Sequence, residues 1–226
     1  MQEISVNKIQ IFRFEWNYIN TNMYVIESED SILVIDPVET EETQRFWRDR
    51  EKCIANITVF LTHEHFDHIN GLNYLRSKFT CMVISSESCS KNITNPRKNL
   101  SEYSYFMKEM NEDVRKSEIE IQPFVCKPAD IIFQCEIKTT WMGHGLQLIR
   151  TPGHTQGSVC VIFDEKIVFT GDSLLRRPII TKLPGGCKKD YMNVTRKKLL
   201  TLLKQVEIVC PGHGEPDIAD MFEKFI

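Results

Sequence analysis

An α/β fold is predicted for this chain by three features of its sequence. Short apolar runs with the composition of strands alternate with segments that carry helical patterns. Several of the apolar runs end at a loop that contains glycine together with histidine or aspartate. The length of 226 residues is enough to bury a sizeable core within one domain. We therefore expect residues 1–226 to form a single α/β domain with its chemistry at strand ends.

The N-terminal part of the chain is predicted to be rich in strands. Residues 4–14 alternate apolar and polar side chains, which indicates one strand. Residues 22–27 and 32–35 indicate a hairpin, because four polar residues separate them. The second strand of this hairpin ends at Asp36, since Pro37 cannot continue it.

Helices and strands then alternate. Residues 39–53 are predicted to be helical because the segment is acidic at its start and carries Arg and Lys toward its end, as the helix dipole favours. Residues 56–61 form an apolar strand that leads into a loop rich in histidine. A helix at 71–78 and a short strand at 81–84 complete this half.

The segment from about 88 to 125 differs in character and is predicted to be a helical insertion. It opens with loop-forming residues, and residues 101–120 are charged and prone to form a helix. Tyr103, Phe106, Met107 and Met110 lie roughly on one face of that helix. Such a stripe is more often a packing face than a cofactor site, and its position makes the segment a candidate lid or substrate wall.

The second half again combines strands with helices. Residues 190–204 are predicted to form an amphipathic helix with Asp190 as its N-cap, and residues 217–225 a closing helix. Asp164 and Glu165 are predicted to form a two-residue hairpin turn. The predicted strands of this half are 131–141, 146–150, 158–163, 166–169 and 206–210.

The composition and the cysteine pattern indicate a protein of a reducing compartment. The net charge of −3 offers no general attraction to nucleic acid. The N-terminus lacks the features of a signal peptide, and no apolar stretch is long enough to cross a membrane. The eight cysteines are scattered without a C-x-x-C pair, so reduced thiols are expected rather than disulfides. We therefore predict a cytoplasmic protein with no nucleic-acid or membrane partner.

The densest group of metal-capable side chains follows the strand at 56–61. Residues i and i+2 of an extended segment point to the same side, so His63 and His65 can bind one ion. Asp67 and His68 follow as the chain turns, and they suit a second ion nearby. Imidazole and carboxylate groups are suitable ligands for Zn²⁺ and other first-row metals. Three of the six histidines lie in this loop, which argues against a polar turn that contains histidine by chance.

Three other strand ends carry one metal-capable side chain each, beside a glycine. His154 and His213 each follow a Pro-Gly pair, and Asp172 follows Thr-Gly. Taken alone, either histidine would more often be a hydrogen-bonded structural residue. Five of the six histidines occupy such positions, and this favours a shared metal site. The sixth, His144, is interpreted as an ordinary loop residue.

The four motifs, in the order H-x-H-x-D-H, T-P-G-H-T-x-G-S, T-G-D and P-G-H-G, resemble those of the metallo-β-lactamase superfamily. Within that superfamily the chain resembles the glyoxalase-II-like hydrolases, partly because of the Leu-Pro-Gly-Gly sequence at 183–186. The resemblance covers residues 22 to 213, nearly the whole chain. It implies a four-layer αβ/βα sandwich, with two divalent metal ions at one edge of the sheets.

The resemblance also implies a role for each candidate residue. It assigns the first ion to the three histidines His63, His65 and His154. It assigns the second ion to Asp67, His68 and His213. It makes Asp172 the carboxylate that bridges the two ions. Asp36 resembles the buried aspartate that lies beneath the histidine loop in this family, where it holds the loop or orients a ligand. A simple turn aspartate is the competing interpretation of Asp36.

The chemistry that this site implies is hydrolysis. Two divalent ions about 3.5–4 Å apart lower the pKa of a shared water, which supplies hydroxide near neutral pH for attack on a carbonyl carbon. Asp67 can orient this nucleophile through its free oxygen and is the predicted catalytic residue. We expect a thioester as the first choice of substrate and a lactone as the second. Zinc is the expected metal, with iron or manganese as alternatives.

Two other functions stay open. A persulfide-dioxygenase-like oxidoreductase would use a single iron at the positions of His63, His65, His154 and Asp172. A metal-bound binding protein without catalysis, gated by residues 90–125, is the non-enzymatic alternative. β-Lactam hydrolysis is disfavoured, because such enzymes lack the bridging aspartate and are typically exported.

The chain departs from glyoxalase II in two places. It ends shortly after His213, without the helical C-terminal domain that helps that enzyme to bind glutathione. Residues 179–182 read Ile-Ile-Thr-Lys instead of the more usual Gly-Arg-Thr-Asp. We therefore expect the substrate contacts to differ, although the metal-binding motifs show no such departure.

Overall fold

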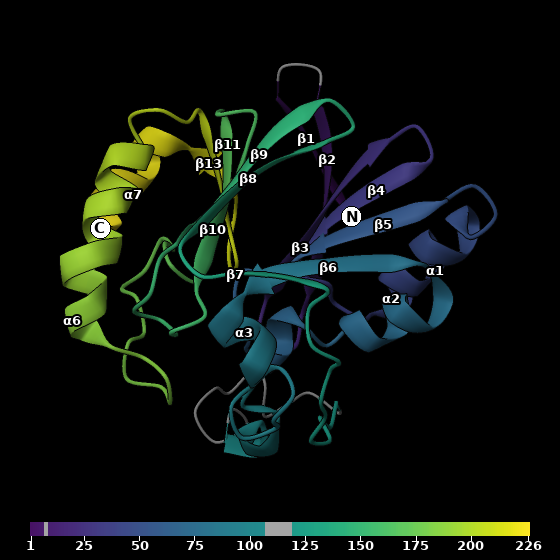
Figure 1. Ribbon diagram of the computed structural model, residues 1–226, viewed down its shortest axis with the longest axis horizontal. Coiled ribbons are helices and arrows are strands. Elements are labelled where there is room, and N and C mark those ends of the chain that lie inside the picture. Colours follow the sequence, from purple (N-terminus) through teal and green to yellow (C-terminus); the bar gives the residue numbers. More distant parts are fainter. Residues whose placement is uncertain (7–8, 107–118) are drawn as a thin grey trace.

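The computed structural model of the chain describes residues 1–6, 9–106 and 119–226. In this part of the chain the strands form two sheets, and helices cover their outer faces (Figure 1). The α1–α2 helices lie against one sheet and the α6–α7 helices against the other, with the two sheets packed between them. This arrangement is the predicted four-layer αβ/βα sandwich.

The first sheet has the strand order β1-β2-β3-β4-β5-β6-β7. Its strands are antiparallel from β1 to β4 and parallel from β4 to β7. The strands are β1 (Gln2–Val6), β2 (Ile9–Trp16), β3 (Thr21–Ser28), β4 (Ser31–Ile35), β5 (Asn56–Phe60), β6 (Cys81–Ser86) and β7 (Ile131–Phe133). Every residue of β4 is buried, because a helical layer covers one face of the sheet and the second sheet covers the other.

The second sheet has the order β13-β12-β11-β10-β9-β8. β11 and β12 are parallel, so their carboxyl ends lie at the same edge of the sheet. The strands are β8 (Glu136–Trp141), β9 (His144–Arg150), β10 (Val159–Phe163), β11 (Ile167–Gly171), β12 (Ile208–Pro211) and β13 (Asp217–Ile218).

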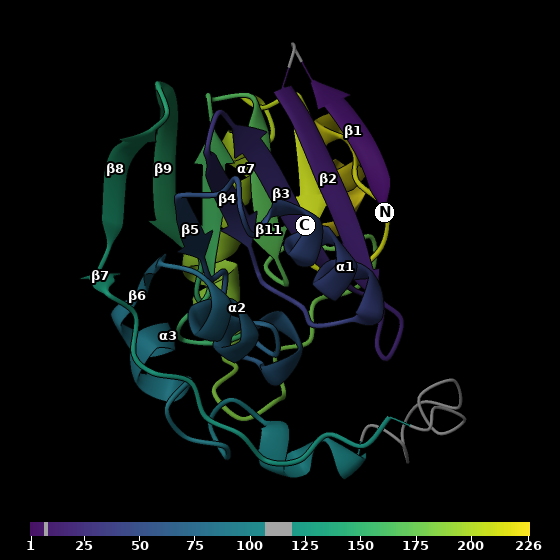
Figure 2. The same ribbon diagram turned by 90° about the vertical axis from the view of Figure 1, so that its right-hand side faces the viewer.

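The helices nearest the first sheet are short and amphipathic. α1 (Glu41–Arg50) begins at a capping box, in which the Thr40 side chain accepts from the Thr43 backbone N–H, and it buries Phe46 and Trp47. α2 (Leu72–Lys78) buries Leu72 and Leu75. Both helices lie in front of the first sheet in Figure 2. α3 (Glu87–Asn92) follows β6 directly.

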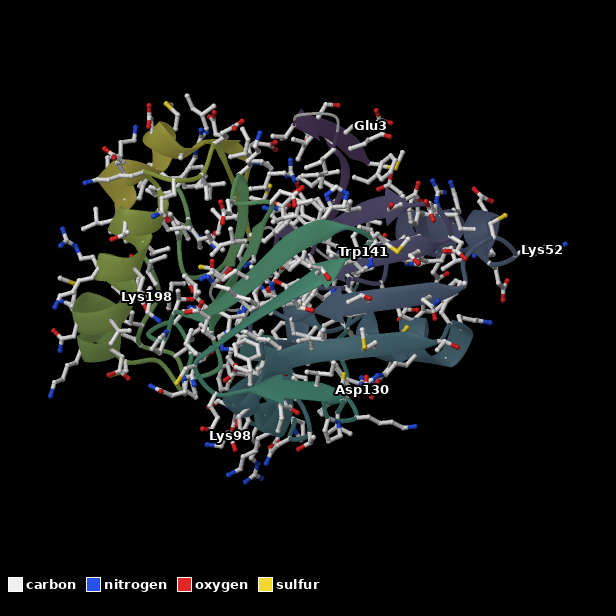
Figure 3. The ribbon with its side chains drawn as sticks, turned by 45° about the horizontal axis from the view of Figure 1, so that its top comes forward. Glu3, Lys52, Lys98, Asp130, Trp141 and Lys198 are labelled. Atoms are coloured by element: carbon white, nitrogen blue, oxygen red, sulfur yellow. The ribbon has the colours of Figure 1, made fainter. Side chains whose placement is uncertain are left out.

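The outer layer of the second sheet is one helical run. α6 (Lys188–Asp190) continues through a π-helical stretch at 191–195 into α7 (Arg196–Leu202). Lys198 on α7 and Lys52 just beyond α1 mark the two opposite sides of the molecule in Figure 3. None of the helices that the structure describes is both long enough and apolar enough to span a membrane.

Three apolar clusters fill the spaces between the four layers. The central cluster lies between the sheets and combines residues such as Leu33 and Phe60 with Leu148 and Phe169. The second joins the first sheet to α1 and α2, and the third joins the second sheet to α7 and the C-terminal segment. All eight cysteines are free, as predicted, and four of them are buried: Cys89, Cys126, Cys160 and Cys210.

Four predicted elements differ in the structure. Residues 4–14 belong to two antiparallel strands, β1 and β2, rather than to one. The predicted strand 131–141 splits into β7 of the first sheet and β8 of the second. Asp190 is not an N-cap, because the helix starts at Lys188, and its side chain accepts a hydrogen bond from Gln156 instead. The predicted helix 217–225 is strand β13 followed by a 3₁₀ helix.

The predicted insertion can be compared only in part, because residues 107–118 lie outside the described chain. Met107 and Met110 fall there, so the proposed helical face is not tested. Before this gap the chain forms α3 and a 3₁₀ turn at Ser101–Tyr103. Tyr103 and Phe106 are exposed toward solvent at 37% and 43%, and both also line the cavity described below.

Candidate metal centre

The site is built on the carboxyl ends of strands from both sheets. Asp36 follows β4, and the loop from Thr62 to His68 follows the parallel neighbour β5. In the second sheet, His154 follows β9, Asp172 follows β11 and His213 follows β12. The parallel pairs β4–β5 and β11–β12 end at this edge, so residues distant in the sequence meet there. The side chains of all seven predicted ligands are almost fully buried, and none is more than 10% exposed to solvent.

Asp36 holds the start of the histidine loop. Its backbone has a positive φ of 53°, which aspartate tolerates better than most residues. Its Oδ1 accepts from the Thr62 backbone N–H at 2.7 Å, and its Oδ2 accepts from the Thr62 hydroxyl. Oδ2 also lies 2.8 Å from Nδ1 of His68. These contacts give Asp36 a structural position beneath the loop rather than that of a free turn residue.

Two groups of three side chains face one another at the site. In the first group, formed by His63, His65 and His154, one potential ligand atom from each residue lies within 4.8 Å of the other two. His65 Nδ1 and His154 Nε2 are 3.0 Å apart. The first predicted ligand set is therefore assembled from the β5 loop and the loop after β9.

The second group consists of Asp67, His68 and His213 and meets the same distance criterion. Oδ2 of Asp67 lies 3.3 Å from Nε2 of His68 and 3.5 Å from Nε2 of His213. A third group that meets this criterion contains Asp36 with His63 and His68. Asp36 already accepts hydrogen bonds through both oxygens, so it is better suited to orient His68 than to bind an ion.

Asp172 joins the first two groups. Its Oδ2 is 3.4 Å from Nε2 of His154 and 3.4 Å from Nε2 of His213, and its Oδ1 is 3.5 Å from Nε2 of His68. One carboxylate thus contacts members of both ligand sets.

The donor set fits divalent metal ions. Two nitrogen or oxygen atoms bound to one tetrahedral Zn²⁺ at about 2.0–2.1 Å are about 3.3 Å apart, close to the 3.0–3.5 Å separations observed here. The buried polar atoms of the site that have no hydrogen-bond partner also include Nε2 of His63, Nε2 of His68 and Oδ1 of Asp172. Burial of such atoms is costly unless they find a partner, and a metal ion supplies one.

The outer ring nitrogens of three histidines are held by oxygen acceptors. Nδ1 of His154 donates to the Ile180 carbonyl at 2.8 Å, and Nδ1 of His213 donates to the Ile19 carbonyl at 3.0 Å. Nδ1 of His68 faces Asp36. A proton on Nδ1 leaves the Nε2 lone pair directed toward the site, which is the tautomer that metal binding needs.

Burial and neighbouring charges move the pKa values of the site in two directions. Burial, together with the neighbouring histidines, lowers the pKa of His65 to about 3 and that of His63 well below its ordinary value. Burial also opposes charge on His68, but the carboxylates of Asp67 and Asp36 outweigh it and raise the pKa. His63 and His65 are thus held as neutral imidazoles, whereas His68 favours its protonated form, so a cation that binds at the second group competes with a proton on His68.

Several residues that support the site carried no recognisable signal in the sequence. Thr21, at the start of β3, donates its hydroxyl to Oδ2 of Asp67 at 2.8 Å. Glu64 lies inside the histidine motif but faces away from the ligand groups, and its carboxylate accepts from Asn92 at 2.8 Å and from Thr155 at 2.9 Å. Thr155 is adjacent to His154, so Glu64 ties the two loops of the first group together. Among these supporting residues, Glu64 alone had a signal in the sequence, namely its position between His63 and His65.

His144 and Cys187 lie outside both ligand groups. His144 is the first residue of β9, and its Nδ1 lies 2.7 Å from Asp164. Cys187 precedes α6, and its backbone N–H donates to the carbonyl of Gly153 at 2.8 Å. Cys187 is also absent from the residues that line the cavity.

Gly212 brings the β12 loop close to the site, and this contact predicts the effect of a methyl group there. A Cβ at this position would lie 2.5 Å from Oδ1 of Asp172 and 2.7 Å from Cε1 of His68. We expect Gly212→Ala to weaken metal binding by about 10- to 100-fold, because it displaces the Asp172 carboxylate, which contacts both ligand groups. Titration of the metal-free protein with Zn²⁺ measures this. Gly143→Ala, at a positive-φ glycine with open space around it, is the control and should retain wild-type affinity.

A model of the metallo-β-lactamase superfamily matches residues 16–213. The chain therefore belongs to this superfamily. A probable metallo-hydrolase of Bacillus subtilis, YqgX, is 30% identical over 204 residues, which cover 88% of each chain. The hydroxyacylglutathione hydrolase of Klebsiella pneumoniae is 24% identical and covers 96% of this chain and 68% of its own length.

Solved structures show the same fold. The B3 metallo-β-lactamase BLEG-1 superposes with a TM-score of 0.71 at 26% identity, covering 93% of this chain and 95% of the other. TTHA1623, solved in a di-iron-bound form, superposes with a TM-score of 0.69 at 23% identity, covering 93% and 96%. The predicted four-layer fold and the predicted superfamily are thereby confirmed.

Proposed function

We propose that this protein is a binuclear metal-dependent hydrolase that cleaves a carbonyl ester, with a thioester as the first candidate and a lactone as the second. The observation that carries the proposal is the contact of Asp172 with both ligand groups. Its carboxylate lies 3.4 Å from His154 in the first group and 3.4 Å from His213 in the second. A shared carboxylate is suited to hold two ions close enough to act on one water.

Two divalent cations bound here would acidify a water and polarise the substrate carbonyl. The chain's own residues then have distinct tasks. His63, His65 and His154 would hold the first cation, and His68 and His213, with Asp67, the second. Asp67 lines the cavity, and Thr21 fixes one of its oxygens, so that the carboxylate can orient the attacking water. Zinc is our first candidate for both positions, with iron and manganese as alternatives.

The cavity beside the site favours water as the nucleophile. Within the described part of the chain, its lining contains no serine and no cysteine. A covalent acyl-enzyme on a serine or a cysteine therefore has no candidate residue there. The hydroxyacylglutathione hydrolase among the relatives supports a thioester as the first substrate class.

The proposal is tested by elemental analysis of the purified protein coupled to hydrolysis assays. We expect about two metal ions per chain and turnover of S-lactoylglutathione or of one member of a thioester and acyl-lactone panel. Removal of the metal by a chelator should reduce the rate by about a thousandfold or more, and added Zn²⁺ should restore it.

Three results would contradict this function. One iron per chain with thiol-dependent oxygen uptake would indicate persulfide-dioxygenase-like chemistry. Two bound metals without turnover of any thioester, lactone or phosphodiester would indicate a metal-bound binding protein. Full activity of a demonstrably metal-free protein would reject the metal centre itself.

A further inference from the structure

A cavity of about 470 Å³ opens beside the candidate metal centre. Five of the seven predicted ligands contribute to its lining: His65, Asp67, His154, Asp172 and His213. The volume lies within the range of pockets that bind small molecules and bury most of their surface. A substrate carbonyl placed at the metal centre would therefore leave the rest of its molecule in contact with the remaining walls of this open cavity.

Those remaining walls are almost entirely apolar. Phe66 lies within the histidine loop, and Leu100 and Phe106 come from the segment after α3. Ile180 and Leu183 come from the loop after β11. Aliphatic and aromatic side chains thus face the cavity from separate parts of the chain. Such walls favour an apolar group on the substrate, because burial of apolar surface stabilises the complex.

Arg177 is the exception in these walls. Apart from the predicted metal ligands, it is the one charged residue that lines the cavity among residues 1–6, 9–106 and 119–226. Its neighbour Arg176 pairs with Asp217, whereas the described residues provide no hydrogen-bond or ion-pair partner for Arg177. Its guanidinium is therefore available to a ligand, and guanidinium groups bind carboxylates through two parallel hydrogen bonds.

We infer that the substrate carries both an apolar portion and a carboxylate, and that Arg177 binds that carboxylate. This inference rests on the proposed function and specifies its substrate class. In the reaction, water adds to the thioester carbonyl and the C–S bond breaks. The acyl group leaves as a carboxylic acid, and the sulfur takes the second proton of the water as a thiol. Arg177 takes no part in these bond changes and acts only as a specificity-determining residue.

The test compares two thioesters that differ only in charge: S-hexanoyl-3-mercaptopropionate and its carboxamide analogue. We expect the wild-type protein to prefer the carboxylate by about tenfold in kcat/KM, and Arg177→Gln to reduce this ratio to near one. Lys182→Gln, which removes a nearby exposed cation that does not line the cavity, should leave the preference unchanged. A second matched pair with the carboxylate on the acyl side shows which product carries it.

Failure of this inference can be separated from failure of the proposed function. A wild-type protein that cleaves both thioesters equally, or an Arg177→Gln variant that keeps the preference, would overturn the inference and leave hydrolysis in place. If neither compound is cleaved, calorimetry with the corresponding non-hydrolysable thioethers decides the matter. Binding that requires both the carboxylate and Arg177 supports the inference, and equal affinity for the charged and neutral thioethers rejects it.

Discussion

Asp172→Ala is expected to lower kcat/KM by about a thousandfold or more while the protein stays folded. The reason is that Asp172 contacts His68, His154 and His213, which belong to both ligand groups. In the proposed binuclear site, loss of this carboxylate would remove the negative charge shared by two cations and leave each group with one ligand fewer. The measurement is hydrolysis at saturating Zn²⁺ together with metal stoichiometry after dialysis.

Two companion variants make this result specific. Asp172→Asn keeps one oxygen ligand, so it should retain more metal than the alanine variant but lose the bridging charge. Asp49→Ala removes an exposed aspartate of α1 and should behave like the wild type. The circular dichroism spectrum of each variant reports whether it is folded. Near-normal turnover by folded Asp172→Ala would rule out a bridging role.

Asp36→Asn is expected to remove the second metal ion and to lower activity by about 10- to 100-fold, as is typical when an outer-sphere partner of a ligand histidine is lost. Oδ2 of Asp36 faces two donors, the Thr62 hydroxyl and Nδ1 of His68. An asparagine that keeps its oxygen toward the Thr62 N–H presents an NH₂ group at this position. Nδ1 of His68 must then accept a hydrogen bond from this NH₂ group, so the ring proton moves to Nε2. A protonated Nε2 has no lone pair to offer a metal ion at the site.

Asparagine suits this experiment better than alanine because it tolerates the positive φ of 53° at position 36 and preserves the volume of the side chain. The expected result is about one metal ion per chain, compared with two in the wild type, and a matching Asp49→Asn variant should retain both. Nitrogen-15 chemical shifts of the His68 ring report its tautomer directly. Two metals bound with unchanged affinity in Asp36→Asn would show that Asp36 serves only to hold the loop.

The secondary structure was predictable wherever the local pattern of apolar and polar side chains corresponds to a single element. The hairpin of β3 and β4, helix α1 and strand β5 appear close to their predicted positions. The segment at 4–14 was predicted as one strand because alternation of side chains continues when a chain reverses into an antiparallel partner. The segment at 131–141 was predicted as one strand because nothing in its composition indicates that β7 pairs with β6 while β8 pairs with β9.

In the C-terminal segment, too, the local sequence did not predict the strand pairing. Residues 217–225 have a composition compatible with a helix, but Asp217 and Ile218 pair with Val209 and Ile208 of β12. Long-range pairing outweighed local preference at this position. The 3₁₀ helix that follows buries Phe222 in the third apolar cluster.

By itself, the sequence determined the superfamily and the strand-rich order of elements, and it predicted which residues could act as metal ligands at the strand ends. This was possible because the ligand motifs are short and local, and each follows an apolar strand. Only the tertiary structure decided how those residues meet, with Asp172 between the two groups and Asp36, Thr21 and carbonyl oxygens behind the ligands. Such contacts join residues far apart in the chain, and they exist only when two separate sheets pack with their carboxyl ends at one edge.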